Sequence, residues 1–234
     1  MAKIRFALEN FSFAFSSSSP LFFDNLSIAI DNPGLTCIVG KNGVGKSTLF
    51  RLLQGIVYSD ERVSGVLHIN DRSYDLSSDV DRKRLYQKSM VLHQNFDSML
   101  APHFTGFENL RFAQFATCPN LSLVHVTERV GQDEQLFALP LDKPVHFLSG
   151  GQRQMLAMLM IAQKELDLLL LDEPIAALDD ANSDYVMQGV VKITEKRNLA
   201  VLCILHDHDI VQKYARNLIK ISQTEAGARI FEIK

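Results

Sequence analysis

The segment from Gly40 to Ser47, Gly-Lys-Asn-Gly-Val-Gly-Lys-Ser, is the feature that most narrows what this chain can form. Its glycines let the backbone curl so that successive N–H groups point at a bound anion. The apolar run 35–39 predicts a buried strand before it, and residues 47–53 predict a helix after it. Because the positive end of that helix faces the same anion, the segment indicates a loop that holds nucleotide phosphates.

Two side chains of this P-loop carry their own chemistry. Lys46 supplies a point charge for the β- and γ-phosphates, and the Ser47 hydroxyl can ligate Mg²⁺. The alternative, a glycine-rich turn with a chance lysine, leaves the preceding strand and following helix unexplained. We therefore expect nucleotide binding by Asn42, Gly43, Gly45, Lys46, Ser47 and Thr48.

A second motif, Leu148-Ser149-Gly150-Gly151-Gln152, precedes the apolar run 155–162. Ser149 is a plausible helix N-cap, and the two glycines again expose backbone N–H groups, although an ordinary capped helix would also fit. With this motif the sequence resembles the ATP-binding cassette (ABC) family, in which Leu-Ser-Gly-Gly-Gln is the signature. The resemblance spans nearly the whole chain and implies ATP contacts by Ser149, Gly150, Gly151 and Gln152.

The run Leu168–Leu171 predicts a buried parallel strand that ends in Asp172 and Glu173. Ligands of open α/β sheets bind where such strands end. The segment resembles the Walker B motif, in which Asp172 would hold Mg²⁺ and Glu173 would act as general base on the attacking water. The alternative is that the two acids only terminate a strand.

Two further family motifs follow in order. Residues 174–180 resemble the D-loop, which implies an ATP contact by Asp179, but Ala176 stands where the family usually has a serine. The predicted strand 199–205 is followed by His206, which resembles the switch histidine that contacts the γ-phosphate. A solvated loop histidine is the alternative for His206, and His208 is expected to lie on the surface.

Gln94 and Phe15 complete the expected site. Gln94 follows a strand-like segment and matches the family's Q-loop glutamine, a Mg²⁺ or water ligand. Phe15 ends an alternating pattern that includes Phe11 and Phe13, and it matches the aromatic residue that stacks on adenine. The alternative is that all three phenylalanines belong to the core.

Composition excludes several classes of protein. The net charge of the 234-residue chain is −3, which does not favour nucleic-acid binding. Apolar runs stay well below the roughly 20 residues of a membrane span, and no secretory signal is expected at the N-terminus. The three cysteines show no pairing or metal spacing, so Cys37 and Cys203 are expected to be small buried residues of a reducing compartment.

The expected fold is α/β: a P-loop NTPase with a RecA-like core sheet, an N-terminal antiparallel β portion and an inserted helical subdomain. Residues 1–94 and 163–234 are expected to form the core with its β portion, and residues 95–162 the helical subdomain. In this insert, residues 107–113 and 123–130 predict helices. No long heptad run interrupts it, which argues against a repair or chromosome-organising ATPase.

The resemblance implies an ATPase with ATP and Mg²⁺ as cofactors, bound to the cytoplasmic face of the inner (plasma) membrane. Expected partners are a second copy or a paralogous ATPase chain, a multi-span permease and, for an importer, an external solute-binding protein, but no nucleic acid. The expected role is to drive import of a small solute. The alternatives are an ATPase of export or lipoprotein release, and a soluble ABC protein outside transport.

Overall fold

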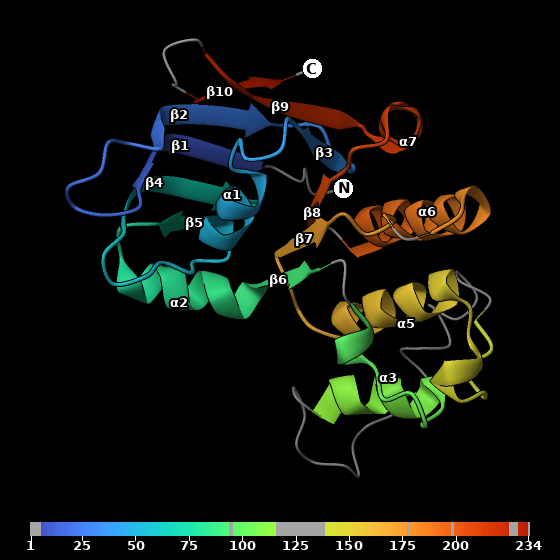
Figure 1. Ribbon diagram of the computed structural model, residues 1–234. Coiled ribbons are helices and arrows are strands. Elements are labelled where there is room, and N and C mark those ends of the chain that lie inside the picture. Colours follow the sequence, from blue (N-terminus) through green and yellow to red (C-terminus); the bar gives the residue numbers. More distant parts are fainter. Residues whose placement is uncertain are drawn as a thin grey trace. The chain divides into compact units, whose positions relative to one another are not determined.

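The structure, a computed structural model, describes residues 6–93, 96–115, 139–176, 178–197, 199–224 and 229–233 (Figure 1). The chain divides into two compact units. The first unit comprises Met1–Val91, Leu166–Glu173 and Thr194–Lys234, and the second comprises Leu92–Glu165 and Pro174–Ile193. The predicted division into a core and a helical subdomain at residues 95 and 162 remains a prediction.

An antiparallel sheet of four strands forms one part of the first unit. Its order is β2-β1-β4-β5, with the strands β1 (Phe6–Ala14), β2 (Phe23–Ile30), β4 (Arg62–Ile69) and β5 (Arg72–Asp75). This sheet confirms the predicted N-terminal antiparallel portion. Its register shifts between Leu8 and Phe11, where Asn10 has a positive φ of 50°, the left-handed conformation that one type of β-bulge uses.

A second sheet of six strands has the order β10-β9-β3-β8-β7-β6. Its strands are β3 (Thr36–Val39), β6 (Ser89–Leu92), β7 (Leu168–Asp172), β8 (Ala200–Ile204), β9 (Asn217–Gln223) and β10 (Arg229–Ile233). Strand β3 runs parallel to β8 and β9, and β7 runs parallel to β8. The carboxyl ends of β3, β7 and β8 therefore meet at one edge, which is where ligands bind in such sheets.

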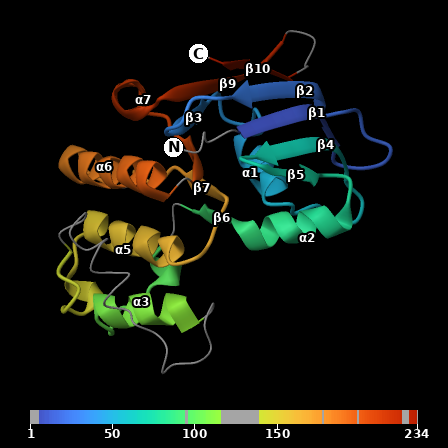
Figure 2. The same cartoon turned by 180° about the vertical axis from the view of Figure 1, so that it is seen from behind.

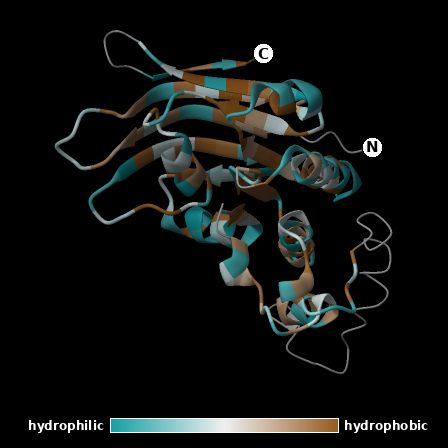
Figure 3. Cartoon of the chain, turned by 45° about the vertical axis from the view of Figure 1, so that its right-hand side comes forward, coloured by the Kyte–Doolittle hydropathy of each residue, from teal (hydrophilic) through white to brown (hydrophobic). Residues whose placement is uncertain are grey.

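Helix α1 (Lys46–Leu53) packs into the core of the first unit. Its residues Leu49, Phe50, Leu52 and Leu53 share one hydrophobic cluster with residues of both sheets. Figures 1 and 2 show α1 beside the four-stranded sheet, and Figure 3 shows hydrophobic residues concentrated along the strands. The P-loop ahead of α1 is thus fixed to a rigid support.

Two short helices complete the first unit on its surface. Helix α2 (Asp79–Lys88) begins at the N-cap Ser78, whose side chain accepts a hydrogen bond from the Asp81 N–H. Helix α7 (His208–Tyr214) begins at Asp207, whose carboxylate accepts bonds from the N–H groups of Asp209 and Ile210. His208 is exposed, as expected.

The second unit is helical. It contains η1 (Phe96–Met99), α3 (Gly106–Phe115), η3 (Val145–Phe147), α5 (Gly150–Ala162) and most of α6 (Asp180–Arg197). Helix α3 confirms the predicted helix at 107–113, whereas the predicted helix at 123–130 lies outside the described residues. Asn109 is fully buried on α3, and its amide bonds the Ala101 N–H and the carbonyls of Ala101 and Thr105.

Helix α5 forms the core of the second unit. Every residue from Gln154 to Ala162 is buried, which explains why its sequence is apolar on all sides. None of the helices in the part of the chain that the structure describes is both long and apolar enough to cross a membrane.

Candidate functional site

The P-loop leaves the carboxyl end of β3 and enters α1. Gly43 and Gly45 have φ values of 80° and 109°, which residues other than glycine rarely adopt. Gly45 is the N-cap of α1 and, as a glycine, makes no side-chain capping bond to the first N–H groups of that helix. These donors therefore face the loop, where an anion would accept their hydrogen bonds.

Lys46 is buried within this loop. Its Nζ donates to the Gly40 carbonyl at 2.8 Å and to the Lys41 carbonyl at 3.2 Å. Burial lowers the pKa of Lys46, while the carboxylates of Glu173 and Asp172 act in the opposite direction. The ammonium group and the two acids at the end of β7 are therefore close enough to interact electrostatically, as expected for one site.

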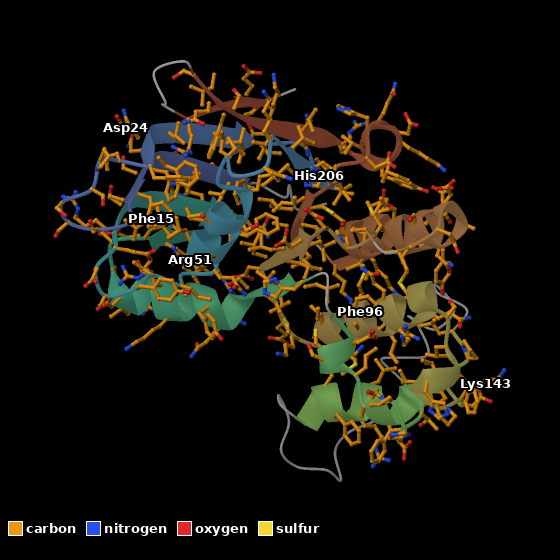
Figure 4. The ribbon with its side chains drawn as sticks, viewed as in Figure 1. Phe15, Asp24, Arg51, Phe96, Lys143 and His206 are labelled. Carbon is orange, nitrogen blue, oxygen red and sulfur yellow. The ribbon has the colours of Figure 1, made fainter. Side chains whose placement is uncertain are left out.

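Glu173 and His206 are brought together from the ends of neighbouring strands. His206 Nε2 lies 2.9 Å from Glu173 Oε1, and the Glu173 N–H donates to the Ile204 carbonyl at 3.2 Å. Glu173 has a positive φ of 52°, a strained conformation for a residue with a side chain. Figure 4 labels His206 at its place after β8.

The donors that the resemblance assigns to Mg²⁺ are of the right chemical type. Ser47 offers a hydroxyl in the first turn of α1, and Asp172 offers a carboxylate at the end of β7. Mg²⁺ prefers such oxygen ligands and usually takes only one or two carboxylates beside substrate phosphates. Within the described ranges, no group of three or more His, Cys, Asp or Glu side chains could hold a metal alone. Gln94 lies outside these ranges.

An aromatic cluster adjoins the P-loop. Phe11 and Phe13 are fully buried, but 46% of Phe15 is exposed, so Phe15 is not a core residue (Figure 4). The Phe15 ring meets those of Phe13 and Phe22 in T-shaped contacts, each with centroids 4.9 Å apart. These contacts hold an exposed aromatic ring in one orientation.

The signature residues form the N-terminus of α5 in the second unit. The Ser149 hydroxyl accepts a bond from the Gln152 N–H, and the Gln152 side chain accepts one from the Ser149 N–H. This capping box confirms Ser149 as the N-cap. A Cβ on Gly151 would lie 2.7 Å from Asn182 Oδ1, so any larger residue here would force Asn182 on α6 to shift.

Asp179 precedes α6 and caps it. Its carboxylate accepts bonds from the Asn182 backbone N–H at 2.8 Å and from the Asn182 side-chain amide at 2.9 Å. These two hydrogen bonds lower the pKa of Asp179. Ala176 is exposed.

Two residues beside the P-loop were not singled out by sequence reasoning. Arg229 at the start of β10 donates from Nε to the Val44 carbonyl at 3.1 Å, and its guanidinium covers the Phe22 ring. Phe22 belongs to an apolar pair with Phe23, which was a visible signal for packing. No local sequence pattern could indicate the role of Arg229, because 185 residues separate it from Val44.

The sequence of this chain is similar to a described protein family and to several known proteins. The family model described as "ABC transporter" matches residues 23–176. The tyrosine transport ATP-binding protein of Clostridioides difficile is 31% identical over 216 residues, covering 87% of this chain and 81% of that protein. A phosphonates import ATP-binding protein of Lactococcus lactis subsp. cremoris is 28% identical, covering 85% of this chain and 82% of that protein.

A solved structure agrees over nearly the whole chain. The structure of cbiO1 from Clostridium perfringens, described as part of the ABC transporter complex cbiONQ, superposes with a TM-score of 0.76. The two chains are 26% identical, and the match covers 93% of this chain and 84% of that one.

Proposed function

Because this chain belongs to the ABC transporter family, we propose that it is the ATPase subunit that drives a separate membrane permease, in a system that imports a small solute. The family binds ATP, and ATPase activity is characteristic of it. The observation that carries the proposal is the contact between Glu173 and His206 at the sheet edge that also bears the Lys46 loop.

The loop Gly40–Ser47 binds the ATP phosphates in this proposal. The N–H groups at the start of α1 and the Lys46 ammonium neutralise their charge. Ser47, Asp172 and Gln94 would hold Mg²⁺, which supplies positive charge to the transferred phosphoryl group. Asn42, Gly43, Gly45 and Thr48 line the same loop, and the exposed ring of Phe15 stacks on adenine.

Glu173 acts as general base on the attacking water. Its carboxylate is oriented by the contact with His206 and by the backbone bond of its own N–H to Ile204. The strained backbone at Glu173 fits a position that is fixed for chemistry. His206 itself contacts the γ-phosphate once ATP is bound.

The signature residues serve a second ATPase chain, either another copy or a paralogue. Ser149 is exposed at the start of α5, and the chain contains a second such helix start at Lys46 in the other unit. One ATP therefore lies between the P-loop of one chain and Ser149–Gln152, with Asp179, of the other. ATP binding closes this dimer and hydrolysis releases it.

Import is favoured because two of the similar proteins are named for tyrosine transport and phosphonates import. The permease would dock on the second unit, around η1 and the loop that follows it, which places the chain at the cytoplasmic face of the inner (plasma) membrane. Phe96, Met99, Pro102 and Phe104 offer apolar surface there, whereas Leu100 is only 8% exposed and belongs to the core. An external solute-binding protein would complete the importer.

The shared ATP site is tested by the mass of Glu173→Gln protein in solution. With Mg-ATP the mass measured by light scattering should double, and with ADP it should stay that of a monomer. Adding Ser149→Arg should prevent dimerisation, because a long cation then occupies the place of the partner's γ-phosphate. Ser59→Arg, an exposed serine of the first unit, is the matched control and should leave the dimer intact.

The transporter assignment is tested by purification of the tagged chain from detergent-solubilised membranes. A multi-span partner should co-purify, and cells that lack the chain should accumulate less of one small solute. Fractionation with ribosomes or DNA and never with a multi-span protein would support the soluble alternative. Secretion or lipoprotein-release defects without loss of uptake would support export.

A further inference from the structure

The peptide bond between Val44 and Gly45 lies inside the loop that we assign to phosphate. Its carbonyl oxygen accepts a hydrogen bond of 3.1 Å from Nε of Arg229. Arg229 is the first residue of β10, at the edge of the six-stranded sheet. A side chain from the last strand of the chain therefore bonds the backbone of the P-loop directly.

Further contacts hold the Arg229 guanidinium in place. Its central carbon lies 3.3 Å from the centroid of the Phe22 ring, and Nη1 donates to the Phe22 carbonyl at 3.4 Å. The Phe22 ring in turn packs on Gly45, because a Cβ on that glycine would lie 2.5 Å from Phe22 Cε1. Arg229 and Phe22 thus both contact the Val44–Gly45 peptide, and they lie on the same side of it.

The hydrogen bond from Arg229 to the Val44 carbonyl also fixes the direction of the Gly45 N–H. A trans peptide is planar, so the Val44 carbonyl and the Gly45 N–H point in opposite directions. Because Arg229 holds the carbonyl on its own side, the Gly45 N–H points away from Arg229. Gly45 has a φ of 109° and no side chain, so nothing of its own prevents this peptide from turning over.

We propose that Arg229 is a positioning residue of the ATPase site that keeps the Gly45 N–H turned toward the bound phosphates. This inference rests on the proposed phosphate-binding role of Gly40–Ser47. Without Arg229 the peptide is free to turn, and it then presents a carbonyl oxygen to the phosphate in place of a donor. Arg229 contributes to the affinity for the phosphates and not to the recognition of the base.

A purely structural role of Arg229 predicts a different result. If Arg229 only tied β10 to the rest of the first unit, its loss would lower the unfolding temperature and leave nucleotide affinity unchanged in the folded fraction. If Arg229 acted through Phe22 on the exposed Phe15 ring, its loss would weaken the binding of nucleotides to an extent that depends on their base. The three roles therefore separate in one set of measurements.

The experiment measures dissociation constants of ATP, GTP and inorganic triphosphate for the full chain and for Arg229→Gln. We expect the three constants to rise by a similar factor, on the order of tenfold, as for loss of one charge-assisted hydrogen bond. The kcat at saturating ATP should stay within about twofold, so the change appears in KM. Arg229→Lys, which retains the charge and a donor group but not the planar guanidinium, should recover part of the affinity.

The matched control is Lys213→Gln, which removes a cation that covers the Tyr214 ring on α7. It should bind the three ligands as the unchanged protein does. Unchanged affinity in Arg229→Gln, or a loss confined to one base, would overturn the inference. Lys46→Ala separates a failure of this inference from a failure of the proposed function. If Lys46→Ala still binds triphosphate normally, the loop does not bind phosphate and the proposed function has failed. If Lys46→Ala loses triphosphate binding, the measurements on Arg229→Gln test the role of Arg229 alone.

Discussion

His206 Nε2 lies 2.9 Å from Glu173 Oε1, although 33 residues separate them in the sequence. The two residues meet because β7 and β8 are parallel neighbours in register, with Asp172 opposite Ile204, and each residue follows its strand. The hydrogen bond gives the carboxylate one orientation before any nucleotide arrives. In the role that we propose for Glu173, a carboxylate fixed in this way can accept a proton from water without first reorganising.

Glu173→Gln should lower ATP turnover by roughly two to four orders of magnitude, the usual contribution of a general base. The amide retains the size of the side chain but has lost the basic oxygen, so ATP binding should remain near normal. Steady-state hydrolysis and equilibrium ATP binding measure the two quantities. Glu9→Gln, an exposed carboxylate on β1, is the control and should hydrolyse ATP normally. Turnover in Glu173→Gln close to that of the unchanged chain would exclude Glu173 as the base.

The sequence predicts the inner strands β3, β7 and β8 of the six-stranded sheet because burial on both faces leaves continuous apolar runs. Residues 168–171 and 200–204 are fully buried in β7 and β8, as such runs indicate. The motifs that follow these strands were located by their resemblance to the ABC family. Glu173 and His206 were each expected to follow a strand, and the structure brings them together at one edge of the sheet.

Elements with little burial were missed. Helix α2 buries only Leu85 among its ten residues, so no apolar period marks it, and β5 has four residues with one buried side chain, Tyr74. The contact of Arg229 with Val44 depends on tertiary structure alone. Local patterns cannot report a contact between residues that only the fold brings together.

Gly151→Ala should destabilise the second unit. The added methyl group would lie 2.7 Å from Asn182 Oδ1 and 3.1 Å from Asn182 Cβ, so the Asn182 side chain and the α6 backbone that carries it would have to shift. Overpacking of this kind costs about 1–3 kcal/mol, which thermal or urea unfolding detects. Gly150→Ala is the matched control, since its methyl group would meet only a flexible Leu178 methyl at 3.2 Å. Equal stability of the two variants would show that α5 and α6 tolerate the methyl group.

Phe15→Ala should weaken ATP binding about tenfold, as for loss of one aromatic stacking contact. Phe15→Tyr retains the ring and should bind normally. Binding of inorganic triphosphate, which has no base, should be the same in all three proteins. A loss of triphosphate affinity in Phe15→Ala would mean that the ring supports the loop through Phe22 rather than contacting adenine.

Met99→Glu should release the chain from the membrane permease that we propose as its partner. Met99 ends η1 in the second unit, is only partly buried and belongs to none of the proposed catalytic or ATP-binding residues. A carboxylate at this place would be desolvated against an apolar partner surface, which is unfavourable without a pairing cation. ATPase activity and the unfolding temperature of the purified chain should stay unchanged, while the chain moves from the membrane to the soluble fraction and solute uptake falls in parallel.

The control for this variant is Tyr86→Glu, which adds the same charge at an exposed aromatic residue of α2 in the first unit. It should remain with the membrane fraction and support normal uptake. If both variants stay membrane-bound and active, the surface around η1 is not the docking site. If both are released, the effect comes from added negative charge in general. Release of Met99→Glu alone, with its ATPase activity intact, would locate the permease contact at η1, because a defect in folding or in the ATP site would also lower hydrolysis.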